Sequence, residues 1–442
     1  MAMERQIEAT SLLVVETPNQ GEVDRVRKMW KKLTVWTDAM LAALVTGVKG
    51  GKWYSLIDNV WNEGNLQDAW KRVKANNGAS GVDGKTVRWF KENAERELDH
   101  IHNLLVSATY EPMPVLRQYI PKPGSQELRP LGVPTVRDRV VQTSLRQVME
   151  PIFERIFAEH SYGFRPGRGC RDALRVVEAA LKEGFIWIVD ADLRRYFDTI
   201  PHEKLMALVE RHIADSRVLE LVRKYLKQGI MEELREWTPE KGTPQGAVIS
   251  PLLANIYLDP LDHLMADKGW KMVRYADDFV VLCRTQEEAQ AALAEIQAWV
   301  TEAQLTLHPE KTRIVHITEG FDFLGYTFRK TYRIPKKKSQ AKFKDNVRVH
   351  TRRANGRSME AIIAKLNVIL CGWYGYFKYS CLTVFLEIDA WLRHRLRAIL
   401  LKYEGKSRWM IAREDHKRWP NAYFAELGLF SLAEAHESES RP

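Results

Sequence analysis

Three aspartates are candidates for metal chemistry because each lies beside a strongly apolar segment. Asp192 closes the segment Phe185-Ile-Trp-Ile-Val-Asp-Ala-Asp, and the pair Asp277-Asp278 separates two short apolar stretches. Burying a carboxylate costs free energy unless a cation or a hydrogen bond compensates it. Mg²⁺ prefers oxygen ligands and shares them with water and substrate phosphates. Two such ions about 4 Å apart activate an attacking hydroxyl and stabilise a departing pyrophosphate, so these residues predict phosphoryl-transfer chemistry.

Each aspartate also has an ordinary structural interpretation. Asp is common in turns, so Asp277-Asp278 alone fits a plain turn. Asp192 alone fits a helix cap or a strand end. Asp190 competes with it, because alternation along a strand places both side chains on the same face. The residue pattern by itself does not choose between Asp190 and Asp192.

The elements that must position these aspartates alternate between strands and helices. Residues 272–275 and 279–283 flank Ala276-Asp277-Asp278 and predict a β-hairpin. The β-branched residues within 185–189 predict a buried strand. Similar patterns predict strands at 115–121 and 128–133, helices at 137–157, 203–228, 249–264 and 287–303, and a second hairpin at 314–328. We therefore expect an α+β region whose sheet is backed by helices on one face.

The segments on either side differ in composition. Residues 1–50 form a polar, partly helical extension, and 56–74 predicts two short helices. From Arg329 to Arg357 the chain is strongly basic, with Asp345 as the only acid of that stretch, and 359–403 is patterned as aromatic-rich helices. We interpret this part as a separate helical module joined by a basic connector.

The overall composition favours a polyanionic partner. The 442 residues carry a formal charge of +10 and a pI near 9.2, which favours nucleic acid or an anionic membrane. The four cysteines include no Cys-x-x-Cys pair, which argues against a zinc module or a disulfide framework. No signal-peptide pattern and no apolar run of about 20 residues occurs, so we expect a cytoplasmic protein without a membrane span.

The candidate residues belong to a series of motifs that resembles the group II intron-encoded reverse transcriptase/maturase family. Tyr275-Ala-Asp-Asp278 resembles the signature hairpin of reverse transcriptases, and Asp192-Leu-Arg-Arg-Tyr-Phe-Asp198 resembles the strand with their first metal aspartate. Five further blocks follow the family's order: Arg129–Pro134, Ser161–Cys170, Gly242–Asp259, Gly320–Tyr326 and Leu370–Phe377. Because no Cys/His module follows the last block, the chain resembles the compact, nuclease-free, class C-like branch.

The resemblance implies a right-hand polymerase with fingers, palm and an α-helical thumb. The boundaries we expect are an N-terminal extension (1–50), an N-terminal RT0-like region with the fingers (51–180), the palm with the catalytic site (181–330), a basic connector and helical thumb (331–403), and a short tail (404–442). Within 402–424, basic residues interleaved with aromatics suit a DNA-binding tail. An amphipathic helix packed on the thumb explains the same pattern equally well.

The resemblance also assigns roles to the site residues. Asp192, Asp277 and Asp278 would hold two Mg²⁺ ions, with Mn²⁺ as a substitute, helped by the Leu193 backbone carbonyl. This assignment selects Asp192 over Asp190.

Five further residues would contact the substrate. Lys122 and Arg129, on facing fingers strands, would clamp the triphosphate. Phe197 would be a steric gate against a 2′-hydroxyl, Gln245 would lie near the nucleotide and template, and Lys311 would neutralise a phosphate. Without the resemblance, Lys122, Arg129 and Lys311 would be interpreted as solvated charges. Phe197 would be interpreted as core packing, and Gln245 as part of a structural turn.

The implied function is that of an RNA-directed DNA polymerase. It would add dNTPs to a DNA or RNA primer on an RNA template, and would also bind its parent group II intron RNA as a splicing maturase. The alternatives are a domesticated enzyme of DNA repair and a maturase-only RNA-binding cofactor. Synthesis of RNA is disfavoured by Phe197, because a small residue at that position would favour it.

Overall fold

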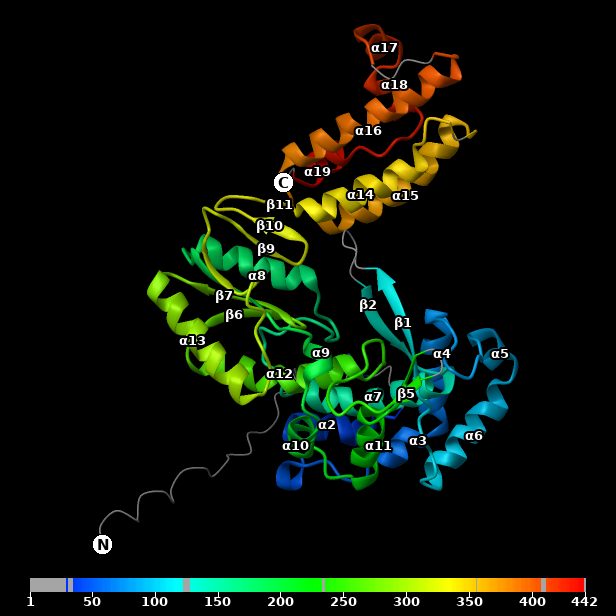
Figure 1. Cartoon of the computed structure of the whole chain (residues 1–442), viewed down its shortest axis with the longest axis vertical. Coiled ribbons are helices and arrows are strands. Elements are labelled where there is room, and N and C mark those ends of the chain that lie inside the picture. The colour runs from blue at the N-terminus through cyan, green and yellow to red at the C-terminus, as the bar shows by residue number, and fades with distance from the viewer. Residues whose placement is uncertain are drawn as a thin grey trace.

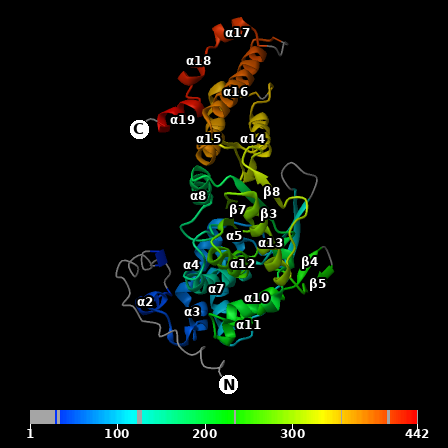
Figure 2. The ribbon, with the colours of Figure 1, turned by 90° about the vertical axis from the view of Figure 1, so that its left-hand side faces the viewer.

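The computed structural model describes residues 29–30, 35–121, 128–232, 235–354, 356–406 and 411–440. Figures 1 and 2 show an elongated molecule with the helices α14 to α19 at one end and the N-terminal helices at the other. The strands of the palm lie between these two ends. The site residues come from this middle part and from the adjoining fingers.

The palm is built on a four-stranded antiparallel sheet in the order β6-β7-β3-β8. Its strands are β6 (Lys271–Tyr275), β7 (Asp278–Cys283), β3 (Trp187–Asp192) and β8 (Arg313–His316). Two of the predicted strand positions, the hairpin at 272–283 and the buried strand before Asp192, are confirmed.

Both faces of the palm sheet are covered, so the expectation of helices on one face only was wrong. Val189 and Val281 point into the core that contains α12 (Ser250–Asp267) and α13 (Gln286–Glu302). Ile188 and Val280, one residue away on each strand, pack on the other face with α8 (Cys170–Lys182). Because successive side chains alternate, strands that are apolar at every position must bury both faces.

The predicted hairpin at 314–328 is confirmed only over residues 321–328, which form an antiparallel pair of strands. Strand β8 joins the palm sheet, with Ile314 opposite Val189. Strands β9 (Phe321–Phe323) and β10 (Tyr326–Phe328) instead form a separate sheet with β11 (Arg333–Pro335). The rings of Phe321 and Phe328 stack in parallel at 5.1 Å, which fixes this small sheet against the α8 face.

The fingers contain the predicted pair β1 (Val115–Pro121) and β2 (Leu128–Val133), with Ile120 opposite Arg129. Two short strands that we did not predict, β4 (Ile230–Glu232) and β5 (Arg235–Trp237), extend this sheet to the order β2-β1-β4-β5. Strand β4 runs parallel to β1, so a segment between two palm helices becomes part of the fingers sheet.

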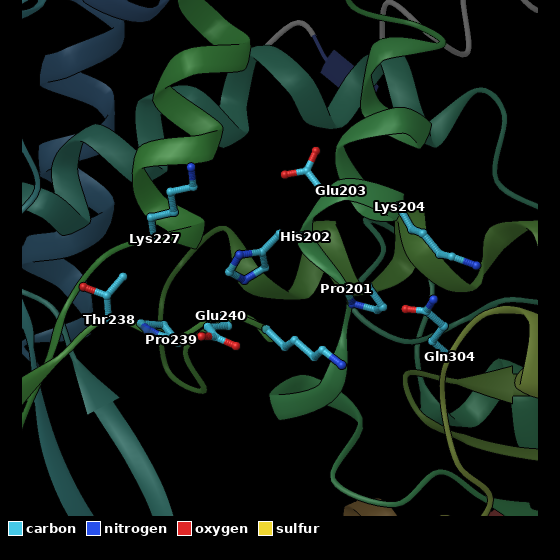
Figure 3. Close-up of a pocket in the computed structure, with 10 residues that line it drawn as sticks. Pro201, His202, Glu203, Lys204, Lys227, Thr238, Pro239, Glu240 and Gln304 are labelled. Atoms are coloured by element: carbon cyan, nitrogen blue, oxygen red, sulfur yellow. The ribbon is translucent and has the colours of Figure 1, made fainter.

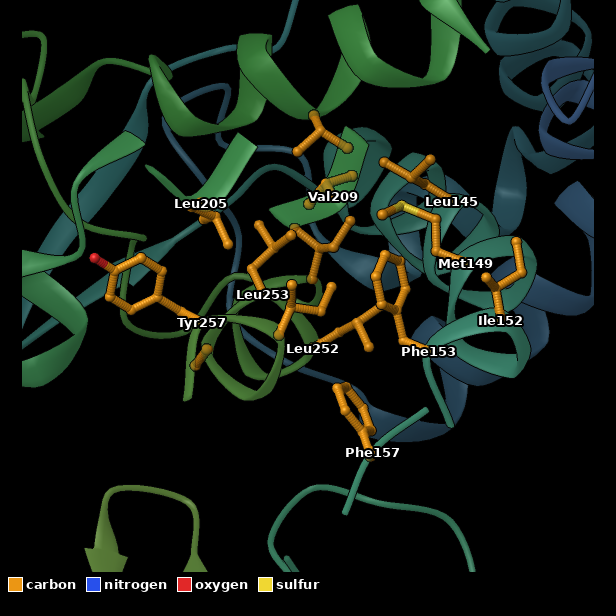
Figure 4. Close-up of a cluster of buried hydrophobic side chains, with 14 of the residues drawn as sticks. Leu145, Met149, Ile152, Phe153, Phe157, Leu205, Val209, Leu252, Leu253 and Tyr257 are labelled. Atoms are coloured by element: carbon orange, nitrogen blue, oxygen red, sulfur yellow. The ribbon is translucent and has the colours of Figure 1, made fainter. Parts of the chain in front are cut away.

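The core beneath fingers and palm is organised around helix α7 (Val136–Glu154), which is buried along nearly its whole length. In Figure 4, Leu145, Met149 and Phe153 of α7 lie among side chains of α10 (His202–Glu210) and α12. Burying one such side chain stabilises the fold by about 1.5–3 kcal/mol. This core makes the base of the palm rigid.

The remaining helices of this region surround α7. The predicted helix at 203–228 is two helices, α10 and α11 (Ser216–Leu226), because the Asp215 side chain accepts hydrogen bonds from the amides of Arg217 and Val218 and so caps a new helix. The N-terminal part contains α2 (Asp38–Thr46), a 3-10 turn (Lys49–Gly51), α3 (Ile57–Trp61), α4 (Glu63–Asn76), α5 (Val87–Glu92) and α6 (Ala94–Val106).

The thumb has its own hydrophobic core. Much of the segment that we expected to be a connector is helix α14 (Lys337–His350), which contributes Phe343 and Val347 to that core. The long helices α15 (Met359–Phe377) and α16 (Leu382–Tyr403) complete it.

The tail packs back on the thumb. Its helices are α17 (Arg413–Arg418), α18 (Asn421–Glu426) and α19 (Leu432–Ser440), and α19 lies along α16 in Figure 1. Trp419 and Phe424 are buried in the thumb core, which matches the packing alternative for these residues. Arg408 and Trp409 lie outside the described residues. None of the helices in the described ranges is both long and apolar enough to cross a membrane.

Candidate active site

The three candidate aspartates meet at one end of the palm sheet. In the antiparallel pairing of β3 with β7, Asp192 lies directly opposite Asp278, so their side chains share a face. Asp277 precedes Asp278 in the two-residue turn between β6 and β7, where Ala276 adopts a left-handed φ of 59°. We call Asp192, Asp277 and Asp278 the palm acidic site.

The charges of the palm acidic site repel one another. Burial, together with the negative charges of Asp190, Asp277 and Asp192, raises the pKa of Asp278 to about 7. Burial also raises the pKa of Asp277, to which the Asp192 charge adds, while Arg129 acts in the opposite direction. Two partly buried carboxylates whose pKa values are raised, beside a third carboxylate, form the environment that a divalent cation stabilises.

One cation of the chain already contacts this group. The Lys311 ammonium forms an ion pair with Oδ2 of Asp192, and the Lys311 side chain is 61 % exposed. Such an exposed pair contributes little free energy. Within the described ranges, no three His, Cys, Asp or Glu side chains are already gathered closely enough to hold a metal ion. An all-oxygen donor set that remains open fits Mg²⁺, which takes further ligands from water and substrate.

The backbone at the end of β3 orients the Leu193 carbonyl. The Asp192 carbonyl accepts a hydrogen bond of 2.7 Å from the His308 amide, and the Arg194 amide donates one of 2.8 Å to Thr306. Because backbone groups of successive residues point to opposite sides of a strand, the Leu193 carbonyl points away from this segment, towards the β6–β7 hairpin.

Asp190 lies deeper in the sheet than Asp192. It shares the face of Asp192, as alternation required, but its register partners are Val280 and Arg313 rather than Asp278. Burial raises the pKa of Asp190, and the Arg313 guanidinium at 3.5 Å opposes that shift. Asp192 is therefore the acid of this strand that directly faces the hairpin.

Of the remaining predicted substrate residues, the structure describes Arg129, Phe197 and Gln245. Arg129 is exposed on β2, and its charge reaches Asp277. Phe197 lies on the short helix α9 (Tyr196–Thr199), half-buried and edge-on to Tyr196. Gln245 is half-buried, and its carbonyl accepts a 2.6 Å hydrogen bond from Gly132 of β2, which ties its loop to the fingers. Lys122 lies outside the described residues.

A buried polar network that sequence reasoning missed supports the β6–β7 turn. Arg274, fully buried, forms an ion pair with Asp262 and donates hydrogen bonds to Asn255 (3.0 Å) and to the Ala276 carbonyl (2.9 Å). Asn255 in turn donates to the carbonyl of Gly163 at 2.8 Å. The sequence feature that could have revealed this network is an arginine inside an apolar strand together with an aspartate inside an apolar helix. Both are charges that need a partner when they are buried.

Gly163 allows the turn to approach this network. A Cβ atom at position 163 would lie 2.2 Å from the Ala276 amide nitrogen, so any side chain would push the turn away. The backbone between Ser161 and Tyr162 also pairs with Arg274. The palm acidic site is thus held from below by buried groups on three separate segments.

A hollow of ≈730 Å³ lies where the start of α10 meets the segment before Gly242 (Figure 3). Pro201, His202, Lys204, Lys227, Glu240 and Gln304 are among its lining residues, and none of the three aspartates is. A ring nitrogen of His202 lies 2.7 Å from the Gly242 carbonyl, so this hollow borders the loop that carries Gln245.

Two family models match the chain. Residues 120–328 match the model described as reverse transcriptase (RNA-dependent DNA polymerase), and residues 340–421 match the maturase-specific domain of group II introns. The first match covers the fingers strands β2, β4 and β5, the end of β1 and the whole palm sheet, and it confirms the predicted α+β, right-hand polymerase fold. The second covers most of the thumb.

Individual relatives agree with these matches. Protein YkfC of Escherichia coli is 35 % identical over 285 residues, which are 56 % of this chain and 74 % of YkfC. The group II intron-encoded protein LtrA of Lactococcus lactis is 30 % identical over 328 residues, 59 % of this chain and 54 % of LtrA. The chain thus spans about three quarters of YkfC and about half of LtrA.

Solved structures resemble the chain more distantly. A chain of the telomerase from Candida albicans covers 81 % of this chain at 14 % identity with a TM-score of 0.42, and the match spans 69 % of that chain. A partial Cas6-RT-Cas1–Cas2 complex covers 56 % at 24 % identity with a TM-score of 0.36, over 41 % of its matching chain. The family models and the curated relatives therefore decide the assignment: the chain belongs to the group II intron reverse transcriptase and maturase family, with the metal-dependent catalytic domain of an RNA-directed DNA polymerase.

Proposed function

We propose that this chain copies RNA into DNA by adding dNTPs to a primer 3′-hydroxyl, with two Mg²⁺ ions held by Asp192, Asp277 and Asp278. The observation that carries the proposal is the register that places Asp192 opposite Asp278, one residue from Asp277. When bound, the ions activate the attacking hydroxyl and stabilise the pyrophosphate leaving the α-phosphate. Mn²⁺ has the same oxygen preference and serves as a substitute.

The chain's own groups have distinct tasks in this proposal. Asp192 and Asp278 supply carboxylate oxygens from adjacent strands, and the Leu193 carbonyl adds a neutral oxygen from the end of β3. Arg129, whose charge already reaches Asp277, binds the triphosphate from the fingers, with Lys122 as the second cation of that clamp. The Lys311 ammonium leaves Asp192 and pairs with a substrate phosphate when the Asp192 carboxylate binds a metal ion.

Two half-buried residues would select and align the nucleotide. Phe197 presents its ring beside the strand that ends in Asp192, where it would stack on the sugar and clash with a 2′-hydroxyl. Gln245 is held at the junction of palm and fingers by the bond from Gly132, and it would lie near the incoming nucleotide and the template.

Primer extension by Asp277→Asn tests the proposal. We expect extension on an RNA template to fall by about 10³-fold or more, since several kcal/mol of charge stabilisation are lost. Affinity for the template–primer should stay close to that of the parent protein. Asp267→Asn, a matched change of an exposed aspartate at the end of α12, should retain full activity. Extension by a clean Asp277→Asn preparation at the parent rate would refute the site.

A second function, binding of the parent group II intron RNA as a maturase, is favoured by a cationic cleft in the thumb. This thumb cleft has a volume of ≈610 Å³ and is lined by Arg348, Val349, Thr351, Arg352, Arg353, His394, Arg395, Ala398 and Ile399. Lys344, Arg348 and Arg395 also lie within 6 Å of the Trp391 ring centroid. Cations gathered without a lining acid suit an RNA phosphate backbone. Self-splicing of the flanking intron RNA with and without the protein tests this function.

Both activities fit the bacterial cytoplasm or nucleoid as the place of action. The four cysteines are free thiols, and Cys283 is buried in the palm, so the fold needs no oxidising compartment.

A further inference from the structure

An exposed tryptophan on β5, a strand that sequence patterns did not predict, lies beside an arginine of β1. Trp237, on β5, is 39 % exposed, and the Arg117 guanidinium of β1 lies 5.2 Å from its ring centroid. An aromatic ring that stays exposed next to a cation is the combination with which proteins bind single-stranded nucleic acids, through stacking and phosphate contact.

These two residues border a cavity of ≈260 Å³ at the junction of fingers and palm, which we call the Trp237 cavity. Its lining includes Arg117, Pro130, Asp198, Trp237, Lys241 and Gln245. Gln245 belongs to the loop proposed above to lie beside the template, and Asp198 directly follows Phe197. The volume is below the roughly 300–1,000 Å³ of pockets that enclose whole small-molecule ligands, so it suits one base rather than a whole nucleotide cofactor.

The fingers sheet separates the Trp237 cavity from the side where the triphosphate would bind. Arg117 pairs with Gly132, and both line the cavity from one face of the sheet. Arg129 is three residues before Gly132 on β2, so alternation places its side chain on the opposite face. The incoming nucleotide and the primer end would occupy the Arg129 side, which leaves the unpaired template as the strand that reaches the cavity.

The charges of the cavity fit a phosphate at its rim and a base in its interior. Arg117 and Lys241 outnumber Asp198, whose pKa is raised mainly by burial although the charges of Arg117 and Arg195 oppose the shift. The hollow of Figure 3 continues from the cavity, because Pro239 and Lys241 line both. It adds Lys204 and Lys227, which would contact the next phosphates along the same strand, as well as Glu203 and Glu240.

We propose that the Trp237 cavity binds the first unpaired template nucleotide beyond the templating base. Its base lies against Trp237 and its phosphate lies between Arg117 and Lys241. This inference rests on the proposed polymerase function, since it requires a template that is read at Gln245. It goes further by assigning a binding site to the single-stranded template before it is copied.

Template overhangs of increasing length test the inference in the full-length protein. A primer–template with one unpaired template nucleotide offers only the templating base, and one with two also offers the base for the cavity. For the parent protein, affinity should rise about 5- to 150-fold between these two templates, the usual range for stacking one base on an aromatic side chain. Trp237→Ala should lose most of that gain, and Trp237→Phe should retain most of it.

An abasic site at the second overhang position separates stacking from a general loss of structure. The parent protein should bind this template as weakly as Trp237→Ala binds the intact one, and the abasic site should add no further loss in the variant. Tyr54→Ala, which removes an exposed aromatic ring far along the chain from β5, should respond like the parent protein. Lys241→Ala should lower the salt dependence of binding to the longer overhang, by about 0.7 in logarithmic slope for one phosphate on a single strand.

The outcomes distinguish this inference from the proposed function. If the parent protein extends primers but gains no affinity from the second overhang nucleotide, or if Trp237→Ala gains as much, the cavity assignment is wrong and the polymerase proposal stands. If the parent protein extends no primer on any template, the proposed function itself fails. Should Trp237→Ala not fold, the Lys241→Ala slope and the abasic template in the parent protein decide the question.

Discussion

The palm acidic site and the thumb cleft are both clusters of like charge, but the chain holds them in different ways. Asp277 and Asp278 lie on a turn that buried Arg274 and Gly163 fix from below. The cations of the thumb cleft come from α14, from the segment directly after it and from α16, and Arg352 and His394 are exposed. Like charge on a buried, rigid support serves small ions at fixed positions, whereas like charge spread over a solvent-facing cleft serves a long polyanion.

This comparison predicts that the two regions respond differently to the loss of one residue. A change in the palm support should alter chemistry more than binding, because it moves atoms that must be placed within a fraction of an ångström. A change in the thumb cleft should alter binding in proportion to the charge removed. The three predictions below test this difference, from the largest expected effect to the smallest.

The largest effect is expected when the buried support of the palm turn is broken. Arg274→Met leaves Asp262 buried without its partner, which should lower the free energy of unfolding by about 3–5 kcal/mol. Urea unfolding measures this loss. The primer-extension rate of the variant should fall by more than the fraction of unfolded protein accounts for. Arg88→Met, at an exposed ion pair on α5, should change the unfolding free energy by less than about 1 kcal/mol. Equal losses in the two variants would contradict the buried network.

A smaller effect concerns pH. The Asp278 pKa of about 7 lies above its ordinary value of 3.8, so the metal-free folded protein binds more protons than the unfolded chain between these values. Stability should therefore fall as the pH rises from about 4 to about 7, by at most about 4 kcal/mol from this group. Asp278→Asn should flatten that dependence, and Mg²⁺ should stabilise the parent protein more at pH 8 than at pH 5. A Mg²⁺ effect independent of pH and of Asp278 would contradict this electrostatic account.

The smallest effect per residue is expected in the thumb. Arg352→Gln should weaken binding of structured RNA at every salt concentration, and should reduce the logarithmic salt slope by about 1 if the side chain contacts one phosphate. Rates of single-nucleotide addition on saturating template should not change. Arg88→Gln on α5 is the matched surface control. A fall in the addition rate without a change in the salt slope would show that the thumb cleft does not act as a phosphate site.

Sequence patterns predicted the elements that carry the site better than the contacts that support it. The apolar runs around Asp192 and Asp277-Asp278 were long enough to show strand character, and their register followed once the strands paired. The Arg274–Asp262 pair could not be derived, because the sequence does not show which two buried charges come into contact in the folded chain. Strands β4 and β5 have three residues each, too short to show a period, so Trp237 appeared on the fingers only in the structure.

The two errors in the palm have the same physical origin. Strand β8 and strand β9 are close in the chain, and a local pairing was the simplest prediction. Strand β8 instead pairs with β3 in the palm sheet. The stacked rings of Phe321 and Phe328 favour a separate sheet on the α8 face. Long-range burial decided which strands paired, and it also covered the second face of the palm.

The number of divalent ions bound in the palm tests the central claim most directly. Mn²⁺ can be counted by electron paramagnetic resonance in the presence of an RNA template, a primer without a 3′-hydroxyl and the matching dNTP. We predict two tightly bound ions per chain for the parent protein, and a loss of tight binding in Asp192→Asn and in Asp278→Asn but not in Asp267→Asn. Two tightly bound ions in Asp192→Asn, with the parent affinity, would contradict the account.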